Sequence, residues 1–113
     1  MTVSRNKFKK TLGSFATGVT IVTTCLNNKR HGLTVNAFSS LSMDPPLVLI
    51  CIDKKTESNR ILKQSKIFAI NILNKKQKNL SKIFSDPNNK NRFYGVKTTT
   101  KITGSPIIVN SLG

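Results

Sequence analysis

Hydroxyl and amide side chains are concentrated in residues 34–42, whose sequence is TVNAFSSLS. The segment is predicted to be extended, and alternation along an extended chain places Thr34, Asn36 and Ser40 toward one face. Such side chains can hydrogen-bond the carbonyls and ring nitrogens of a flat heterocycle. A half-exposed strand with its polar side in water would show the same pattern, so this segment alone does not identify a ligand site.

A second polar segment, DKKTES at residues 53–58, joins an apolar run to a predicted helix. The amides and positive dipole end of a helix N-terminus attract anions, and Lys54 and Lys55 add two ammonium groups. An ordinary helix cap with solvated lysines would have the same sequence. A short strand separates the two polar segments, so one ligand with an aromatic head and a phosphate tail could contact both.

Other common chemistries lack the residues they need. His31 is the only histidine and lies in a predicted turn, where an exposed side chain is expected. With two distant cysteines it does not form a structural zinc set, so no metal site is predicted. Four acidic residues in turn or helix-start contexts disfavour paired-carboxylate catalysis. No G-x-S-x-G, Walker A or G-x-G-x-x-G motif occurs, and no catalytic side chain is assigned.

The length and composition indicate one small domain, residues 1–113. Apolar residues make up 37% of the chain, which is slightly low for a globular protein. The shortfall suggests that the core is completed by a partner subunit or by further sequence.

The charge is strongly positive, with 19 Lys and Arg residues against 4 Asp and Glu and a formal net charge of +15. Such chains attract nucleic acids, anionic membranes and phosphorylated ligands. Here the basic residues are scattered and mostly lysine, and the chain has no Trp and one Tyr, unlike proteins that read bases or stack on them. Solvated lysines explain the charge better than nucleic-acid binding, although the charge favours an anionic ligand.

The two cysteines, Cys25 and Cys51, lie in apolar runs and do not form a C-x-x-C pair. They are expected to be buried, reduced thiols, since a bridge between them would require neighbouring strands. No signal peptide follows the N-terminal charges, and the longest apolar run, residues 47–52, is too short to span a bilayer. These features predict a cytoplasmic protein with no membrane partner.

Hydrophobic spacing predicts the elements of the first half of the chain. Phe8, Leu12 and Phe15 follow a helical period, in a helix opened by Ser4 or Thr2. The remaining predictions, in chain order, are a strand at 19–26, a hairpin turn at 27–32, a return strand at 33–38 that continues past a bend over 39–43, a turn at 44–46, and a strand at 47–52 that is buried on both faces.

The second half is predicted to contain a helix at 56–64 with Thr56 as its N-cap, a buried strand at 67–73 and a helix at 75–84. A polar loop at 85–92, an edge strand at 96–102, a turn at 102–106 and a strand at 107–109 follow. This order favours a small antiparallel barrel flanked by helices over a Rossmann succession, and therefore a mainly β (α+β) fold class.

Four segments, in order, resemble a known family: FKKTLGSFATGVTIVTT, HGLTVNAFSSLSMDPPLVLICID, FAINIL and ITGSPI. They are similar to the flavin reductase-like, FMN-binding split-barrel proteins, which include the short-chain reductase components of two-component flavin monooxygenases. The resemblance covers residues 8–112, and residues 34–46 are its most specific part.

The resemblance implies a homodimeric split β-barrel that binds FMN or FAD and passes a hydride from NADH or NADPH to the flavin, with a monooxygenase as a possible recipient of reduced flavin. It also implies a flavin site in which the phosphate lies near Lys54, Thr56 and Ser58. The full set of cofactor-binding residues it implies is Thr34, Val35, Asn36, Ala37, Ser39, Ser40, Lys54, Thr56, Ser58 and Asn71.

Family domains continue past the TGSPI turn with strands that close the barrel and carry a histidine-containing segment near the nicotinamide site. The barrel of this chain is therefore expected to be incomplete at its C-terminal end. Three alternatives stay open: a flavin-binding or interaction module without turnover, a basic nucleic-acid-binding protein, and a relative that uses another cofactor such as haem or a deazaflavin.

Overall fold

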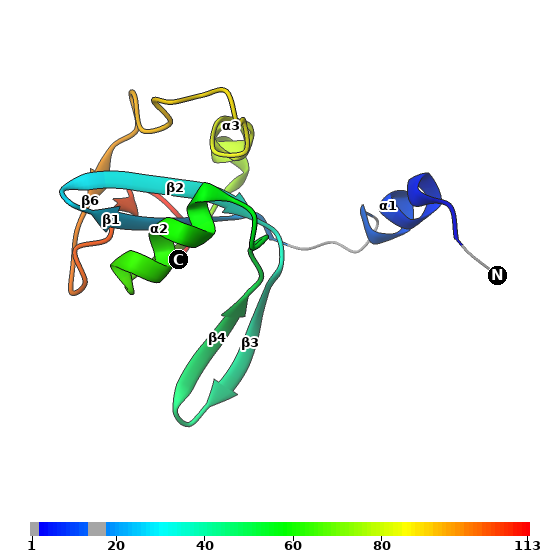
Figure 1. Ribbon diagram of the computed structural model, residues 1–113, viewed down its shortest axis with the longest axis horizontal. Helices are drawn as coiled ribbons and strands as arrows, with labels where there is room; N and C mark the ends of the chain where they lie inside the picture. The colour runs from blue at the N-terminus through cyan, green and yellow to red at the C-terminus, as the bar shows by residue number, and fades with distance from the viewer. Residues whose placement is uncertain (1–2, 14–17) are drawn as a thin grey trace.

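The computed structural model describes residues 3–13 and 18–113, and its elements follow the predicted order (Figure 1). In chain order they are α1 (Arg5–Gly13), β1 (Thr20–Leu26), β2 (Lys29–Val35), β3 (Phe38–Met43), β4 (Pro46–Ile50), α2 (Glu57–Ser65), β5 (Ala69–Ile72), the 3-10 helix η1 (Lys75–Gln77), α3 (Lys78–Ile83), β6 (Thr98–Thr99) and β7 (Ile107–Ile108). The described strands form three antiparallel sheets, β2-β1-β5, β3-β4 and β6-β7. This confirms the predicted mainly β (α+β) class.

The central sheet is built around β1, whose sequence TIVTTCL is rich in β-branched residues that favour strands. A two-residue turn joins β1 to β2, with Asn27 and Asn28 both at positive φ, as a tight hairpin turn requires. The turn predicted at residues 27–32 is therefore too long. Because the turn is so tight, β2 already begins at Lys29, and His31 lies within a strand.

The main hydrophobic cluster packs against this sheet and consists of Ile21, Leu73, Phe84, Phe93 and Ile108. The buried threonines of β1 are all hydrogen-bonded to the backbone of neighbouring segments. Thr20 donates to the carbonyl of Val35, Thr23 to that of Pro106 and Thr24 to that of Ile67. These bonds satisfy buried hydroxyl groups and tie β1 to the segments around it.

The hairpin formed by β3 and β4 extends away from the central sheet (Figure 1). The prediction that residues 47–52 form a strand buried on both faces is wrong. Leu47, Val48 and Leu49 are each 44–47% exposed, and Met43 at the hairpin tip is 90% exposed. An uninterrupted apolar sequence indicates that a strand has two apolar faces, but it does not say which surface covers them.

Most predicted helices and turns agree with the structure. Thr56 caps α2, and its side chain accepts a hydrogen bond from the amide of Asn59 at 3.2 Å. The residues expected to form the third helix are divided between η1 and α3, and the edge strand predicted over residues 96–102 is reduced to Thr98–Thr99. The alternating Thr and Lys residues predicted a strand, but the ladder with β7 contains only two residue pairs.

The N-terminal helix α1 lies apart from the sheets (Figure 1), and Phe8 on it is 57% exposed. Ser4 accepts a hydrogen bond from the amide of Lys7, which agrees with its predicted place at the helix start. Thr2 and Phe15, also named in the helix prediction, lie outside the described residues. Among the helices that the structure describes, none has the length and apolar character needed to cross a membrane.

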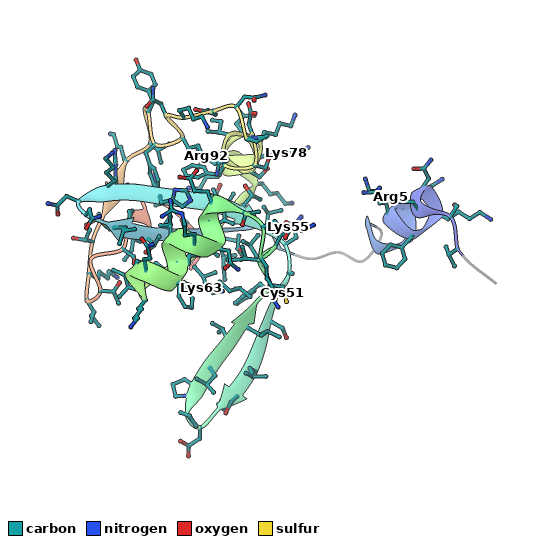
Figure 2. All side chains as sticks on the ribbon, viewed as in Figure 1. Arg5, Cys51, Lys55, Lys63, Lys78 and Arg92 are labelled. Atoms are coloured by element: carbon teal, nitrogen blue, oxygen red, sulfur yellow. The ribbon has the colours of Figure 1, made fainter. Side chains whose placement is uncertain are left out.

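The two cysteines differ from expectation in their burial. Both are free thiols, but Cys51 is exposed and Cys25 is half-buried. Figure 2 places Cys51 at the base of the β3–β4 hairpin. Cys51 is exposed for the same reason as β4, because it directly follows this strand, which was expected to be buried on both faces.

Candidate functional site

β2 is an edge strand of the central sheet, and the chain after it covers that edge. The amide of Thr34 donates to the carbonyl of Phe84 at 3.2 Å, and the Thr34 hydroxyl donates to the carbonyl of Ser81 at 2.7 Å. Arg92 adds a third bond, from Nη1 to the carbonyl of Gly32 at 2.8 Å. These bonds satisfy polar groups that an open edge would expose, and they fix α3 and the following loop beside β2.

Gly32 allows this close approach. A Cβ atom at this position would lie 2.8 Å from Cε1 of Phe84 and 3.1 Å from Cζ of Phe93. The two rings pack edge to face, with centroids 4.9 Å apart and an interplanar angle of 84°. Such pairs are favoured beyond the area they bury. Because Gly32 has no side chain, the Phe84–Phe93 pair can pack directly against β2.

A cleft of about 1130 Å³ lies along this edge of β2. Its walls are β2, the first turn of α2 and the segment from Phe84 to Tyr94. The lining residues are Lys29, Arg30, His31, Gly32, Leu33, Thr34, Thr56, Glu57, Ser58, Phe84, Ser85, Pro87, Asn89, Lys90, Asn91, Arg92, Phe93 and Tyr94.

The lining of the cleft is cationic and aromatic. Lys29, Arg30, Lys90 and Arg92 contribute four permanent or nearly permanent positive charges. The Arg30 guanidinium also lies over the Phe93 ring, 4.8 Å from its centroid. This combination suits an anionic ligand with an aromatic portion.

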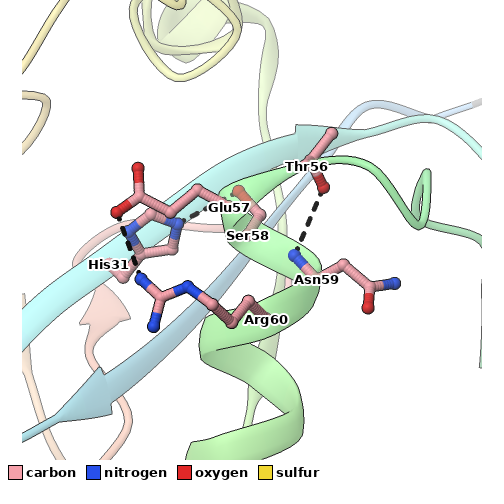
Figure 3. A network of polar contacts seen from close by, with 6 residues as sticks. All are labelled: His31, Thr56, Glu57, Ser58, Asn59 and Arg60. Atoms are coloured by element: carbon pink, nitrogen blue, oxygen red, sulfur yellow. Dashed lines mark hydrogen bonds and ion pairs between the residues drawn. The ribbon is translucent and has the colours of Figure 1, made fainter.

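Glu57, the acidic residue among those lining residues, is engaged by a neighbour on its own helix. Its Oε1 lies 3.4 Å from Nη2 of Arg60, in an exposed pair three residues apart. Such pairs are weak in water, but this one places the Arg60 guanidinium beside the carboxylate (Figure 3) and partly offsets its negative charge. The positive character of the cleft is therefore retained beside the start of the helix.

His31 lies in β2, half-buried, and not in an exposed turn as predicted. Its ring faces the first turn of α2, where Nε2 lies 3.0 Å from Oγ of Ser58 (Figure 3). Burial, followed by the positive charge of Arg92, lowers the pKa of the His31 imidazole from its ordinary value of 6.5. The ring is therefore held mainly in its neutral form near neutral pH.

The loop before α2 is stabilised by its own polar groups. Asp53 accepts a hydrogen bond from the amide of Lys55 at 2.9 Å, and the Thr56 hydroxyl donates to the Asp53 carbonyl at 2.8 Å. The Thr56 hydroxyl is thus used as a helix cap. The first-turn amides of Glu57 and Ser58 have no acceptor within the helix, so they are available to a ligand anion.

The structure brings three of the predicted site residues together, since Thr34, Thr56 and Ser58 all line the cleft. They come from the two polar segments that sequence analysis singled out, so these segments do share a hollow. The remaining predicted residues lie outside the lining: Asn36, Ala37, Ser39 and Ser40 are exposed where the chain passes from β2 into β3, Lys54 is exposed ahead of α2, and Val35 and Asn71 are buried.

Asn71, another residue predicted to bind the flavin, has its side chain in the core. It is 2% exposed, and its Nδ2 donates to the carbonyl of Ile21 at 2.9 Å and to Oγ1 of Thr23 at 3.2 Å. Its Oδ1 accepts a hydrogen bond from the amide of Ile108 at 2.8 Å. The amide group therefore ties β1, β5 and β7 together, and it does not face the cleft.

Sequence reasoning missed much of the cleft. His31 was assigned to a turn, and Arg92 and Phe93 follow a segment described only as a polar loop. A signal was present, because Lys90, Arg92, Phe93 and Tyr94 place bases beside aromatic rings. That arrangement is typical of sites that contact anionic aromatic ligands.

The fold and the cleft together define a small, mainly antiparallel β protein with a cationic, aromatic-lined ligand site. The family model described as "Flavin reductase like domain" matches residues 12–113. The chain belongs to this flavin reductase-like family, and its solved neighbours confirm the expected split-barrel fold.

One similar protein is the reductase subunit HsaB of a flavin-dependent monooxygenase from Rhodococcus jostii, which is 37% identical over 97% of this chain and 56% of its own length. A nitrilotriacetate monooxygenase component B homologue from Mycobacterium thermoresistibile has a structure with a TM-score of 0.90 and 39% identity, over 96% of this chain and 60% of its own. The Streptomyces globisporus NADH:FAD oxidoreductase SgcE6, in complex with NAD and FAD fragments, has a TM-score of 0.83 and 30% identity, over 96% of this chain and 66% of its own. The chain spans about half the length of the curated relatives it matches.

Proposed function

We propose that the cleft binds a flavin, FMN or FAD, and that the protein takes part in NAD(P)H-dependent flavin reduction. The observation that carries the proposal is the cleft itself, in which Thr34 of β2 and Thr56 and Ser58 of α2 meet cationic and aromatic side chains. Membership of the flavin reductase-like family supports the same ligand class.

The residues of the cleft fit a flavin nucleotide. Ligand sites commonly have volumes of roughly 300–1,000 Å³, and the cleft has about 1130 Å³. Phe84, Phe93 and Tyr94 offer apolar surface for a ring system, while Arg30 and Arg92 offer positive charge for an anion. A neutral apolar ligand would not use this charge.

Within this proposal, Lys54, Thr56 and Ser58 lie at the phosphate end, next to the first-turn amides of α2. Thr34 contributes a hydroxyl group on the β2 wall. The site then continues past the cleft along the chain from β2 into β3, through Val35, Asn36, Ala37, Ser39 and Ser40. Asn71 supports this arrangement from the core.

A bound flavin supplies the hydride-accepting ring, so the protein needs no acid or base of its own for that transfer. The task of this chain's residues is to bind and orient the ring and to balance the negative charge of the phosphate. By analogy with the named reductase subunits, we propose a flavin-dependent monooxygenase as the recipient of reduced flavin.

We further propose that the protein forms a homodimer through the β3–β4 hairpin. Phe38, Leu41, Met43, Leu47 and Leu49 give this hairpin several exposed apolar side chains. Exposed apolar surface of this kind is typical of interaction sites. A second copy would cover both apolar faces of β4 and would account for its strand-like, uninterrupted apolar sequence.

The function is tested by titrating FMN and FAD into the purified protein while recording flavin absorbance and fluorescence, and by following NADH and NADPH oxidation at about 340 nm, where the reduced nicotinamide absorbs. A double change, Lys54→Ala with Lys55→Ala, is expected to weaken FMN binding severalfold because it removes positive charge beside the phosphate end. Lys75→Ala with Lys76→Ala is the matched control, since it removes the same charge at η1, away from the cleft lining.

Saturable flavin binding with NAD(P)H oxidation would support the proposal in full. Flavin binding without nicotinamide oxidation would instead support a flavin-binding module that has no turnover. Equal loss of affinity in the two lysine pairs would show that only net charge matters and would contradict a phosphate end at α2.

A further inference from the structure

The contact between His31 and Ser58 joins two walls of the cleft. His31 belongs to β2, Ser58 belongs to the first turn of α2, and their Nε2 and Oγ atoms are 3.0 Å apart (Figure 3). Both side chains are partly buried and both line the cleft. The pair therefore lies beside the helix-start amides that the proposed function assigns to a phosphate.

A serine hydroxyl has a single hydrogen, so its partner decides where that hydrogen points. If Nε2 of His31 carries no proton, the Ser58 hydroxyl donates to it, and Oγ turns lone pairs toward the cleft. If Nε2 is protonated, it donates to Oγ, and the Ser58 hydrogen is free for another acceptor. The second arrangement favours an anionic ligand, whereas the first disfavours one.

Charged groups face His31 from two sides. Glu57 and Arg60 approach from α2, and Arg92 approaches from the segment after α3. On β1 the cross-strand partner is Thr24, which carries no charge. Burial and Arg92 favour the neutral ring, while the carboxylate of Glu57, which favours the charged ring, is paired with Arg60. A phosphate dianion in the cleft would add negative charge and would favour the protonated ring.

We propose that His31 is a positioning residue for the phosphate of a flavin mononucleotide: in the free protein the neutral ring carries its proton on Nδ1, and on binding Nε2 takes up one proton from solvent and turns the Ser58 hydrogen toward the phosphate. This inference rests on the proposed function and deepens it. It makes the cleft selective for phosphorylated flavins over riboflavin, and it links that selectivity to pH.

The test is a calorimetric titration of the whole chain with FMN and with riboflavin, between about pH 6.5 and 8.5. In this range the phosphate remains mostly a dianion, because its second pKa is about 6. Since the proton is bound in the complex and not in the free protein, FMN affinity is expected to rise as pH falls, by up to about tenfold per pH unit. Riboflavin affinity is expected to stay constant.

Titrations in two buffers of different ionisation enthalpy give the number of protons taken up with each FMN. The chain contains one histidine, so histidine uptake is assigned to His31 without ambiguity. His31→Gln and Ser58→Ala should each abolish the pH slope, and the double variant should lose no more than either single variant, because both act through one contact. Lys63→Gln, an exposed residue of α2 outside the cleft lining, is the control that keeps the slope.

FMN binding by the unaltered protein with no proton uptake, or an unchanged slope in His31→Gln, would overturn this inference and leave the flavin site standing. Failure of both FMN and riboflavin to bind would refute the proposed function and the inference with it. Proton uptake with riboflavin as well as FMN would also count against the inference, since riboflavin has no phosphate.

Discussion

At the scale of single residues, the cleft depends on how closely a loop can approach β2. Gly32 is the position where this approach is tightest, because any side chain there meets the Phe84 and Phe93 rings. The Phe93 ring in turn makes a cation–π contact with Arg30. Adding one methyl group at Gly32 would therefore disturb both the aromatic rings that line the cleft and the position of the Arg30 guanidinium.

We expect Gly32→Ala to lower the free energy of unfolding by roughly 1–3 kcal/mol, since the added Cβ overpacks a buried aromatic pair. Urea unfolding followed by circular dichroism measures the change. Gly18→Ala is the matched control, because a Cβ at Gly18 would meet nothing within 4 Å. Equal stability in the two variants would mean that the loop moves away from β2 without cost.

His31 shows how one strand position can be misread from sequence. The Asn-Asn-Lys-Arg-His-Gly run has the composition of a turn, and a turn histidine is normally exposed. The turn in fact uses only Asn27 and Asn28, which tolerate positive φ. Every later residue of the run is thereby shifted into β2, where His31 faces a helix.

At the scale of elements, Asn71 connects β1 and β5 of the central sheet with β7, which belongs to a separate two-stranded sheet. Its side-chain amide bonds to residues of β1 and β7 from a position in β5. The β6–β7 ladder has only two residue pairs, so it holds β7 in place weakly by itself. Asn71 is therefore expected to stabilise the position of β7 against the central sheet.

Asn71→Ala is expected to destabilise the protein by about 2 kcal/mol or more, because the buried amide of Ile108 loses its acceptor. Thermal unfolding, monitored by circular dichroism, provides the measurement. Asn79→Ala removes the same side chain from an exposed position of α3 and should be nearly neutral. A stable Asn71→Ala variant that has lost flavin binding would contradict this purely structural role and support a direct role of Asn71 in the ligand site.

At the scale of the whole molecule, the β3–β4 hairpin is the largest departure from a self-contained fold. Figure 1 shows it extending from the sheet, and its apolar side chains are exposed on both strands. The low apolar fraction of the chain had already suggested a core completed elsewhere. The exposed apolar side chains of the hairpin mark the surface where such a partner would pack.

If the hairpin mediates the proposed homodimer, sedimentation velocity should show a dimer, and a Val48→Thr with Leu49→Thr variant should sediment as a monomer. Threonine keeps the preference for β structure while it removes apolar contact from both faces of the strand. Val109→Thr is the control, since Val109 is also partly exposed but lies outside the hairpin. A monomeric parent protein, or a dimeric variant, would contradict this interface.

The sequence by itself determined the order of the elements, the helix cap at Thr56 and the two polar segments that meet in the cleft. These depend on local physics: side-chain period, capping hydrogen bonds and the charge of a helix start all act within a few residues. The resemblance of residues 8–112 to one family was carried by the same local segments.

Only the tertiary structure decided which side chains line the cleft and which belong to the core. Asn71 and Thr34 look alike as polar residues in strands, yet one is used by β7 and the other faces the cleft. The difference arises because burial depends on contacts between segments distant in sequence, such as β2 with Phe84 and Arg92. No spacing within a strand specifies what will later pack against it.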